Sequence, residues 1–363
     1  MSKSKRHLLL VSPLPPPPGG IAVWTKIIQQ RGIGDGWRTS IVNSGLIGKT
    51  VADSRRSLVI EVTRTVKILL ALIKILVFDP PTVVHINSSL SERGVFRDAL
   101  VVTVARLFRA SVVVNLRGNF IPGKTVGLSS RTESIYRFIF SRSQVVVVLN
   151  HQSKEGVFEL GSFDRKTIVM PNFVDIQNIP ERSSTKNKIF KIAYSGALIE
   201  SKGLRTIFEV AAQLPEIEFI LIGDAPADSR SLGLVNLIQE LPNVLMTGSL
   251  PHNLALQTVS QCDLLFHPSH TEGFPLAIAE AMAIGLPVVA SPVGAIVDMI
   301  DTPQGGFLFP AEASGDYVTA LRALANDREM SNKLGEYNRQ KSRANYAFEQ
   351  VIERWRNIYK STS

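Results

Sequence analysis

The sequence has very little cysteine: a single residue, Cys262, in a chain of 363. It therefore contains no pair of thiols for a disulfide and no Cys-x-x-Cys spacing for a thiolate zinc site. With an apolar fraction of 45%, a chain of this length can form about two domains with full hydrophobic cores. These features predict a globular protein in a reducing compartment, and we expect a cytoplasmic location.

The sequence also lacks an unbroken apolar run long enough to cross a bilayer. The uncharged stretch 281–297 is interrupted by Gly285 and Pro287, which favours a helix, a turn and a buried strand over one spanning helix. A second apolar stretch, 66–78, contains lysines, and no small-residue cleavage site follows residues 7–11. We therefore expect neither a membrane-spanning helix nor a signal peptide.

Charge is distributed unevenly along the chain. Residues 1–185 contain 25 Lys and Arg against 12 Asp and Glu, a net charge of +13, whereas residues 186–363 contain 15 against 19, a net charge of −4. This asymmetry favours an anionic partner for the first half, either a membrane surface, a phosphate-bearing substrate or nucleic acid. No RNP, zinc-finger or basic-zipper pattern is present, so we expect no nucleic acid partner. Ordinary solvated charge is the alternative interpretation.

Short runs rich in Val, Ile and Leu alternate with segments of helix length, a pattern typical of parallel α/β folds. The first series of predicted strands covers residues 7–12, 37–43, 82–87, 111–116, 144–150 and 166–171. The second series covers residues 190–196, 217–224, 243–248, 262–268, 287–291 and 306–309. The two series predict two domains of the same Rossmann-like architecture.

The polar segment 176–188 lacks an apolar period and is predicted to link the two domains. We place the N-terminal domain at residues 1–180 and the C-terminal domain at 187–345. The tail, 346–363, is predicted to contain an amphipathic helix, because its apolar residues recur at three-and-four spacing. These residues are Phe348, Val351, Ile352, Trp355, Ile358 and Tyr359.

The segment most informative about function is 267–291. A predicted strand ends there, a loop with Glu272 follows, and Pro275 begins a helix that Gly285 ends. The free N–H groups and the positive dipole end of such a helix form a cradle for an anion or for hydroxyl groups. Together with Glu280 in the second helical turn, Glu272 provides two carboxylates suited to sugar hydroxyls and a ribose diol. The alternative is a helix cap at Glu272 and a solvated Glu280.

The segment 194–212 is a second strand, glycine-containing loop and helix, with Gly196 in the loop and Lys202 at the helix entrance. A cation is unfavourable at the positive end of a helix, so Lys202 indicates a bound anion such as a diphosphate.

A competing motif is Gly118–Thr125, which matches the P-loop expression and follows a predicted strand. Pro122 has no N–H to donate, and the bulky Phe120 crowds the loop. Gly127 would also interrupt the helix that should start next. A P-loop NTPase or kinase is nevertheless kept as an alternative function.

Histidines give weaker signals. His85 ends the predicted strand 82–87, where a role on the acceptor side of a site and a buried structural role are both open. His267 and His270 lie near Glu272 but lack a third ligand at matching spacing. The chain has no Asp-x-Asp pair, so we expect a site without a metal ion or another cofactor.

Glu272 and Glu280 form the E-x7-E pattern of the retaining family 4 glycosyltransferases, which the chain resembles over nearly its whole length. Further landmarks of that family follow in the same order: PPGG (17–20), MPNFVD (170–175), ESKG (200–203) and FILIGDAP (219–226). The resemblance implies a GT-B fold, in which two Rossmann-like domains face each other across a cleft. It also implies that the C-terminal helix, 346–363, packs back on the N-terminal domain.

The resemblance implies roles for single residues. Glu272 would hold hydroxyls of the donor sugar, Lys202 would neutralise the departing diphosphate, and Glu280 would bind the ribose diol. The implied donor-binding set is Gly20, Gly196, Gly273, Phe274, Pro275, Leu276 and Glu280, with Gly19 beside Gly20 in the first loop. The catalytic set is Lys202 and Glu272.

The sequence departs from the family pattern at two positions. The family usually places an arginine after the glycine of the second-domain loop, but Ala197 follows Gly196 here. Where the family commonly has a histidine after the fourth strand, this chain has Arg117. We assign Arg117, with His85, to the acceptor side.

We therefore predict a retaining glycosyltransferase with a nucleotide-sugar donor, UDP-sugar favoured, and a lipid-linked or surface-polysaccharide acceptor. Besides the NTPase, the alternatives are a sugar-nucleotide epimerase and a non-catalytic binding protein on the same fold. The segment 54–78 mixes basic and aliphatic residues, which fits either a helix at an anionic membrane surface or a buried crossover helix. A helix at the membrane surface would make this a peripheral protein on the inner face of the cell membrane.

Overall fold

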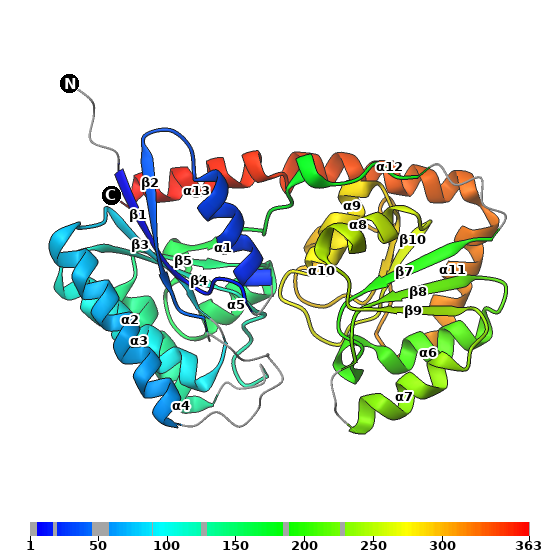
Figure 1. The fold of residues 1–363 in the computed structure, drawn as a ribbon, viewed down its shortest axis with the longest axis horizontal. Helices are drawn as coiled ribbons and strands as arrows, with labels where there is room; N and C mark the ends of the chain where they lie inside the picture. Colours follow the sequence, from blue (N-terminus) through cyan, green and yellow to red (C-terminus); the bar gives the residue numbers. More distant parts are fainter. Residues whose placement is uncertain are drawn as a thin grey trace. The chain divides into compact units, whose positions relative to one another are not determined.

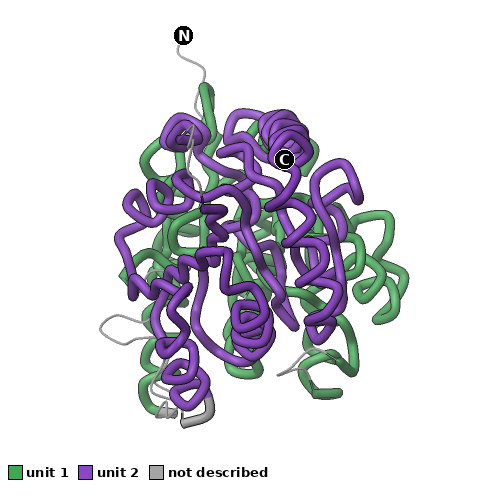
Figure 2. Tube along the Cα trace, turned by 90° about the vertical axis from the view of Figure 1, so that its right-hand side faces the viewer, with its two compact units in different colours: residues 1–172, 351–363 green, residues 173–350 purple. Residues whose placement is uncertain are grey.

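The computed structural model describes residues 6–16, 20–45, 58–88, 90–124, 129–183, 189–225 and 229–362. The chain divides into two compact units, which Figure 2 shows in different colours. Unit 1 comprises residues 1–172 and 351–363, and unit 2 comprises residues 173–350. Within the described ranges, no helix is long and apolar enough to cross a membrane.

Unit 1 contains a six-stranded parallel sheet with the strand order β2-β1-β3-β4-β5-β6. Its strands are β1 (Arg6–Ser12), β2 (Trp37–Asn43), β3 (Val83–Ser88), β4 (Ser111–Leu116), β5 (Val145–Val148) and β6 (Thr167–Val169). Its α-helices are α1 (Gly20–Arg31), α2 (Leu58–Phe78), α3 (Glu92–Leu107), α4 (Ser130–Arg142), α5 (His151–Glu159) and most of α13 (Phe348–Ser361). The central strands are buried on both faces, which explains their continuous aliphatic runs.

The two faces of this sheet are covered by different helices (Figure 1). Val84 and Ile86 of β3 belong to the core that α2, α3 and α4 complete. His85, between them, points to the other face and contacts α1 and α13, as the alternation of side chains along a strand requires. The helices α2, α3 and α4 therefore lie side by side over one face of the sheet.

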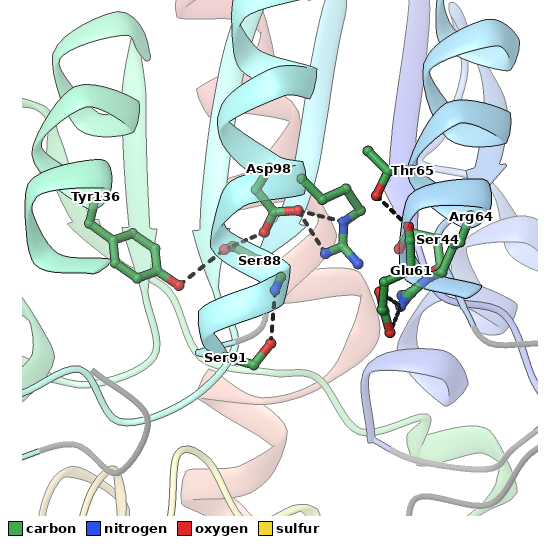
Figure 3. A network of polar contacts seen from close by, with 10 residues as sticks. Ser44, Glu61, Arg64, Thr65, Ser88, Ser91, Asp98 and Tyr136 are labelled. Carbon is green, nitrogen blue, oxygen red and sulfur yellow. Dashed lines mark hydrogen bonds and ion pairs between the residues drawn. The ribbon is translucent and has the colours of Figure 1, made fainter. Parts of the chain in front are cut away.

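Buried polar groups tie this helical layer to the sheet (Figure 3). Asp98 of α3 accepts a hydrogen bond of 2.6 Å from the hydroxyl of Ser88 and pairs with the neighbouring Arg97 at 2.7 Å. The hydroxyl of Tyr136 on α4 lies 3.5 Å from the hydroxyl of Ser88. Burial raises the pKa of Tyr136. At the start of α2, Arg64 binds the backbone oxygen of Ser44, which follows β2. These contacts fix the positions of the three helices.

Unit 2 repeats the architecture with the strand order β12-β11-β10-β7-β8-β9, again all parallel. Its strands are β7 (Lys191–Ser195), β8 (Glu218–Ile222), β9 (Val244–Gly248), β10 (Leu264–His267), β11 (Val288–Ala290) and β12 (Gly306–Leu308). Its α-helices are α6 (Leu204–Gln213), α7 (Ser229–Gln239), α8 (His252–Ser260), α9 (Leu276–Ile284), α10 (Ile296–Met299), α11 (Ser314–Asn326) and α12 (Arg328–Asn345). All twelve predicted strands are present, with ends that differ from the prediction by at most two residues.

The unit boundaries differ from the predicted domain limits of 1–180, 187–345 and 346–363. Unit 2 already begins at residue 173, because Val174 hydrogen-bonds to the backbone on both sides of Ala347. The polar residues 176–183 consequently belong to unit 2, and 184–188 lie outside the described residues. The apolar face of α13 is buried, and its residues from 351 onward belong to unit 1.

Candidate active site

The loop that carries Glu272 runs from the end of β10 to the start of α9. Pro275 is the N-cap of α9, and its side chain makes no capping hydrogen bond to the first helical turn. Gly294 fixes the loop: its φ is +57°, and a Cβ there would lie 1.9 Å from the carbonyl oxygen of Glu272. The predicted helix start is thus confirmed, and its N–H groups receive no side-chain cap from Pro275.

Glu272 lies between two donors. The Nζ atom of Lys202 is 2.7 Å from Glu272 Oε1, and Nε2 of His267 is 2.8 Å from the same oxygen. In the part of the chain that the structure describes, no hydrogen bond reaches the second oxygen, Oε2. One oxygen of Glu272 is therefore held by the protein, while the other keeps its capacity to accept a hydrogen bond from a ligand.

The carboxylate of Glu272 is strongly stabilised in its charged form. Burial favours the neutral acid, but the hydrogen bond from His267 and the charge of Lys202 outweigh it and lower the pKa of Glu272 to about 2. Burial, with the charge of Glu272, raises the pKa of Tyr194, whose ring stacks on His267. Glu272 is thus an acceptor at any physiological pH and is not set up as a proton donor.

His267 orients this carboxylate. Its Nδ1 atom is buried and has no hydrogen-bond partner among the described residues, so a single ring proton is best placed on Nε2, where Glu272 accepts it. The sequence did not give His267 this role. His270 lies apart from this contact and pairs with Glu312 at 3.1 Å. No three His, Cys, Asp or Glu side chains in the described ranges form a set that could hold a metal ion.

Lys202 comes from the loop between β7 and α6, as the sequence predicted. The turn Glu200–Lys202 ends at Gly203, whose φ is +79° and whose missing Cβ leaves room for the carbonyl oxygen of Pro268. This close approach places Lys202 beside the loop of Glu272, and Nζ also donates to the backbone oxygen of Thr271 at 3.0 Å. Like α9, α6 begins without a side-chain cap.

The other predicted loop glycine, Gly196, donates its N–H to the backbone oxygen of Ile222, which fixes the end of β7. Ala197, in place of the family's arginine, is exposed, and its carbonyl oxygen accepts a hydrogen bond from Tyr194. Gly20 begins α1 in unit 1, whereas Gly19 and residues 17–18 lie outside the described residues.

Glu280 has a different partner, which sequence reasoning missed. Nε2 of His252, the first residue of α8, lies 2.8 Å from Glu280 Oε1. The hydrogen bond to Glu280 raises the pKa of His252. No described group bonds to Oε2 of Glu280, so this carboxylate also keeps one open acceptor oxygen. The pair joins residues 28 apart in the sequence, with no local signal to connect them.

His85, predicted for the acceptor side, is fully buried in unit 1. Its Nε2 donates to Asn87 Oδ1 at 3.1 Å, and its Nδ1 accepts from the hydroxyl of Tyr359 at 2.7 Å. Burial, helped by the charge of Arg117, lowers the pKa of His85 to about 3. This neutral and fully bonded ring fits the structural alternative, and the acceptor role stays a prediction.

Arg117, the second acceptor-side residue, follows β4 in unit 1. Its guanidinium lies 5.3 Å from the ring centroid of Trp24, and burial lowers its pKa to about 9. Its Nε atom has no hydrogen-bond partner, and no carboxylate among the described residues pairs with it. Such a cation has unused capacity to bind an anion.

The structure contradicts the P-loop interpretation of Gly118–Thr125. A P-loop leads directly into a helix, but among the described residues the next helix is α4, which starts at Ser130 with its own capping box. The carboxylate of Glu133 accepts the N–H of Gly123 at 2.8 Å, where a phosphate would have to bind. Thr125 lies outside the described residues.

The region that contains these carboxylates matches a known family. Residues 175–341 match the family model described as Glycosyl transferases group 1. These residues form a group 1 glycosyltransferase domain. The glycosyltransferase domain includes Lys202, His252, His267, Glu272 and Glu280, so the contacts of both carboxylates lie within it.

Curated relatives share parts of the chain. A sulfoquinovosyl transferase of Arabidopsis thaliana is 34% identical over 42% of this chain and 29% of its own length. An N-acetyl-alpha-D-glucosaminyl L-malate synthase of Bacillus anthracis is 24% identical over 69% of this chain and 68% of its own length. The chain therefore spans a minor part of the first relative and about two thirds of the second.

A solved structure extends the likeness to both units. HepE from Anabaena, solved in complex with UDP, is similar with a TM-score of 0.77 at 16% identity. The match covers 98% of this chain and 100% of that chain. At this identity the likeness concerns the fold, and it confirms the predicted GT-B fold with two Rossmann-like units.

Proposed function

We propose that this protein is a retaining glycosyltransferase that transfers a sugar from a nucleoside-diphosphate sugar to a glycan or lipid-linked acceptor of the cell envelope. One observation carries the proposal. Within the glycosyltransferase domain, Glu272 and Glu280 each have one oxygen held by the protein and one open, and Glu272 lies beside Lys202, just before the uncapped start of α9. Open carboxylate oxygens bind hydroxyls, and the lysine and helix start bind phosphate.

The roles follow from these contacts. Glu280 accepts from the ribose hydroxyls, Glu272 accepts from hydroxyls of the donor sugar, and the Gly273–Leu276 backbone faces the sugar and phosphate. Lys202 pairs with Glu272 in the structure and is drawn toward the diphosphate when the donor binds. His267 then still holds Glu272, because its hydrogen bond does not depend on the lysine.

The reaction breaks the bond between the anomeric carbon and the diphosphate oxygen and forms a bond to an acceptor hydroxyl oxygen. The hydroxyl proton leaves with the departing phosphate, whose oxygen gains negative charge as the bond breaks. Lys202 and the start of α9 stabilise that charge. The scheme needs no metal ion, so we expect a chelator to leave turnover unchanged.

The identity of the donor is supported by the neighbour HepE, which was solved with UDP. UDP-sugars are therefore the first candidates. The acceptor is proposed from the basic composition of residues 1–185, which suits a phosphate-bearing, lipid-carried glycan. We place the reaction at the cytoplasmic side of the membrane, where lipid-carried precursors and nucleotide sugars meet.

The test is a panel of nucleotide sugars with product analysis. Transfer to an acceptor, with the anomeric configuration kept in the product, is the expected result. An epimerase would convert the sugar nucleotide without an acceptor, and a binding protein would bind a donor without turnover. Either outcome, or strict dependence on a divalent cation, would contradict the proposal.

A further inference from the structure

The outward face of α2 is apolar. The exposed aliphatic residues along this face recur at three-and-four spacing: Val59, Val62, Val66, Leu70, Ile73 and Val77. Leu70, near the middle, is 62% exposed. The opposite face supplies Ile68, Leu72 and Leu76 to the core of unit 1. A surface helix normally has a polar outer face. In α2 the outer face is apolar as well, and unit 1 leaves it exposed.

The two helices beside α2 continue this surface. Phe96, at 56% exposure, and Leu107, at 75%, project from α3, with Leu100 between them. Phe138 of α4 lies in a shallow, mainly apolar groove with Phe96 and Leu100. We call the exposed side chains of α2, α3 and α4 the outer face of unit 1. Figure 1 shows where these three helices lie.

The charges on the outer face have almost one sign. Its exposed cations include Lys67, Lys74, Arg131, Arg137 and Arg142. Among the described residues of the three helices, Glu92 is the one exposed carboxylate. Asp98 is buried with Arg97, and Glu61 pairs with Arg64. The apolar stripe is therefore bordered by cations, with almost no exposed acid to neutralise them.

We infer that the outer face of unit 1 docks on the surface of a bilayer that contains anionic phospholipids. Aliphatic side chains enter the acyl boundary while the lysines and arginines meet the head-group phosphates. A helix of this length lies along the surface for about 30 Å, at 1.5 Å per residue. Since no described helix can span a membrane, the contact is interfacial.

A second copy of this chain is a poorer occupant. In a two-fold dimer the same face would meet itself, and its cations would oppose one another without carboxylates to pair with. An anionic lipid surface supplies both apolar area and opposite charge. The inference rests on unit 1 alone and does not require the proposed transferase activity.

The experiment is cosedimentation of the full chain with phosphatidylglycerol–phosphatidylcholine vesicles and with phosphatidylcholine vesicles. We expect binding to the anionic vesicles only, weakened by high salt. The double variant Val66→Ser/Leu70→Ser should lower the partition constant by at least about tenfold. Its matched control is Leu245→Ser/Val297→Ser, which removes two comparably exposed aliphatic residues from unit 2 and should bind like the parent.

The charge arm uses Lys67→Glu/Lys74→Glu against Lys333→Glu, an exposed lysine of α12. Only the first should abolish binding to anionic vesicles. Absence of binding to either vesicle, or equal binding of the face variants and their controls, would overturn the inference. Sedimentation of the parent as a dimer that the face variants disperse would also overturn it, because a second copy would then cover the face.

Calorimetry with UDP separates this inference from the proposed function. The variants Val66→Ser/Leu70→Ser and Lys67→Glu/Lys74→Glu should keep the parent's nucleotide affinity, since these four residues lie outside the glycosyltransferase domain. Vesicle binding without nucleotide binding would contradict only the proposed function.

Discussion

Each unit places a buried histidine near the end of a parallel strand, and the two histidines have opposite surroundings. In unit 1, His85 bonds to the neutral groups of Asn87 and Tyr359, and both ring nitrogens are used. In unit 2, His267 bonds to the carboxylate of Glu272, which Lys202 shares and which keeps one open oxygen. The first cluster is closed, whereas the second can still accept a hydrogen bond.

The difference shows what distinguishes a structural polar cluster from a binding site. A cluster whose donors and acceptors are all paired gains no hydrogen bond from a ligand, and its removal lowers the free energy of unfolding. A charged cluster with an open acceptor, held on loops before uncapped helices, gains from a ligand. Substitution of His85 should therefore change stability, and substitutions around Glu272 should change turnover or binding.

The largest effect is expected for Lys202→Ala. Turnover should fall by about 10²- to 10³-fold, about 3–4 kcal/mol, because negative charge on the diphosphate is greatest in the transition state. Donor affinity should fall less. Steady-state kinetics and calorimetry measure the two effects. The control is Arg205→Ala, which removes an exposed cation from the first turn of α6. An equal loss of turnover in the Arg205 variant would mean that turnover depends on the overall positive charge and not on the position of Lys202.

Next in size is His85→Ala in the closed cluster. The substitution leaves a cavity and removes the hydrogen bond between the Tyr359 hydroxyl and the imidazole ring, so it should cost about 2–4 kcal/mol in the free energy of unfolding. Urea denaturation measures this, and donor affinity should stay unchanged. If stability is kept while the KM for the acceptor rises, His85 acts on the acceptor side after all.

Glu280→Ala should weaken donor binding by about 2–3 kcal/mol, because a charge-assisted hydrogen bond to the ribose diol is lost. Calorimetry with the nucleotide sugar measures the change in a folded protein. Glu312→Ala is the control, since it removes the carboxylate of another Glu–His pair of unit 2, the one with His270. Unchanged affinity in the Glu280 variant would refute the ribose assignment.

The smallest effect concerns the pH dependence of the His252–Glu280 pair. The hydrogen bond to Glu280 raises the pKa of His252 above about 6.5, so the pair stabilises the fold fully below that pH. This contribution is lost as the pH rises through the raised pKa. The side chain of His252 is 60% exposed, so solvent screening limits the contribution to about 0.5 kcal/mol. The unfolding temperatures of the parent and of His252→Ala should differ more at acid than at alkaline pH. A larger difference at alkaline pH would contradict the raised pKa of His252.

Much of the fold followed from local pattern. The buried strands of parallel sheets are continuous aliphatic runs, and proline and glycine mark the ends of α9, so strands and helix limits could be predicted. The unit boundary at residue 173 could not, because the backbone pairing of Val174 with Ala347 joins distant segments. Lys202 and Glu272 were predicted singly from their loops, but their contact depends on Gly203 fitting against Pro268.

The helices α2 and α13 show the same limit. Apolar periodicity predicted the amphipathic tail helix, and the structure buries its apolar residues in full, with Trp355 at 1% exposure. In α2, aliphatic residues occur on two faces, and the sequence left open whether both are buried. Sequence pattern alone determined the helices and strands and the residue types beside each strand end, because backbone conformation depends on neighbouring residues. Only tertiary structure decided which apolar face stays uncovered and which carboxylate oxygen stays open, because both depend on atoms far away in the chain.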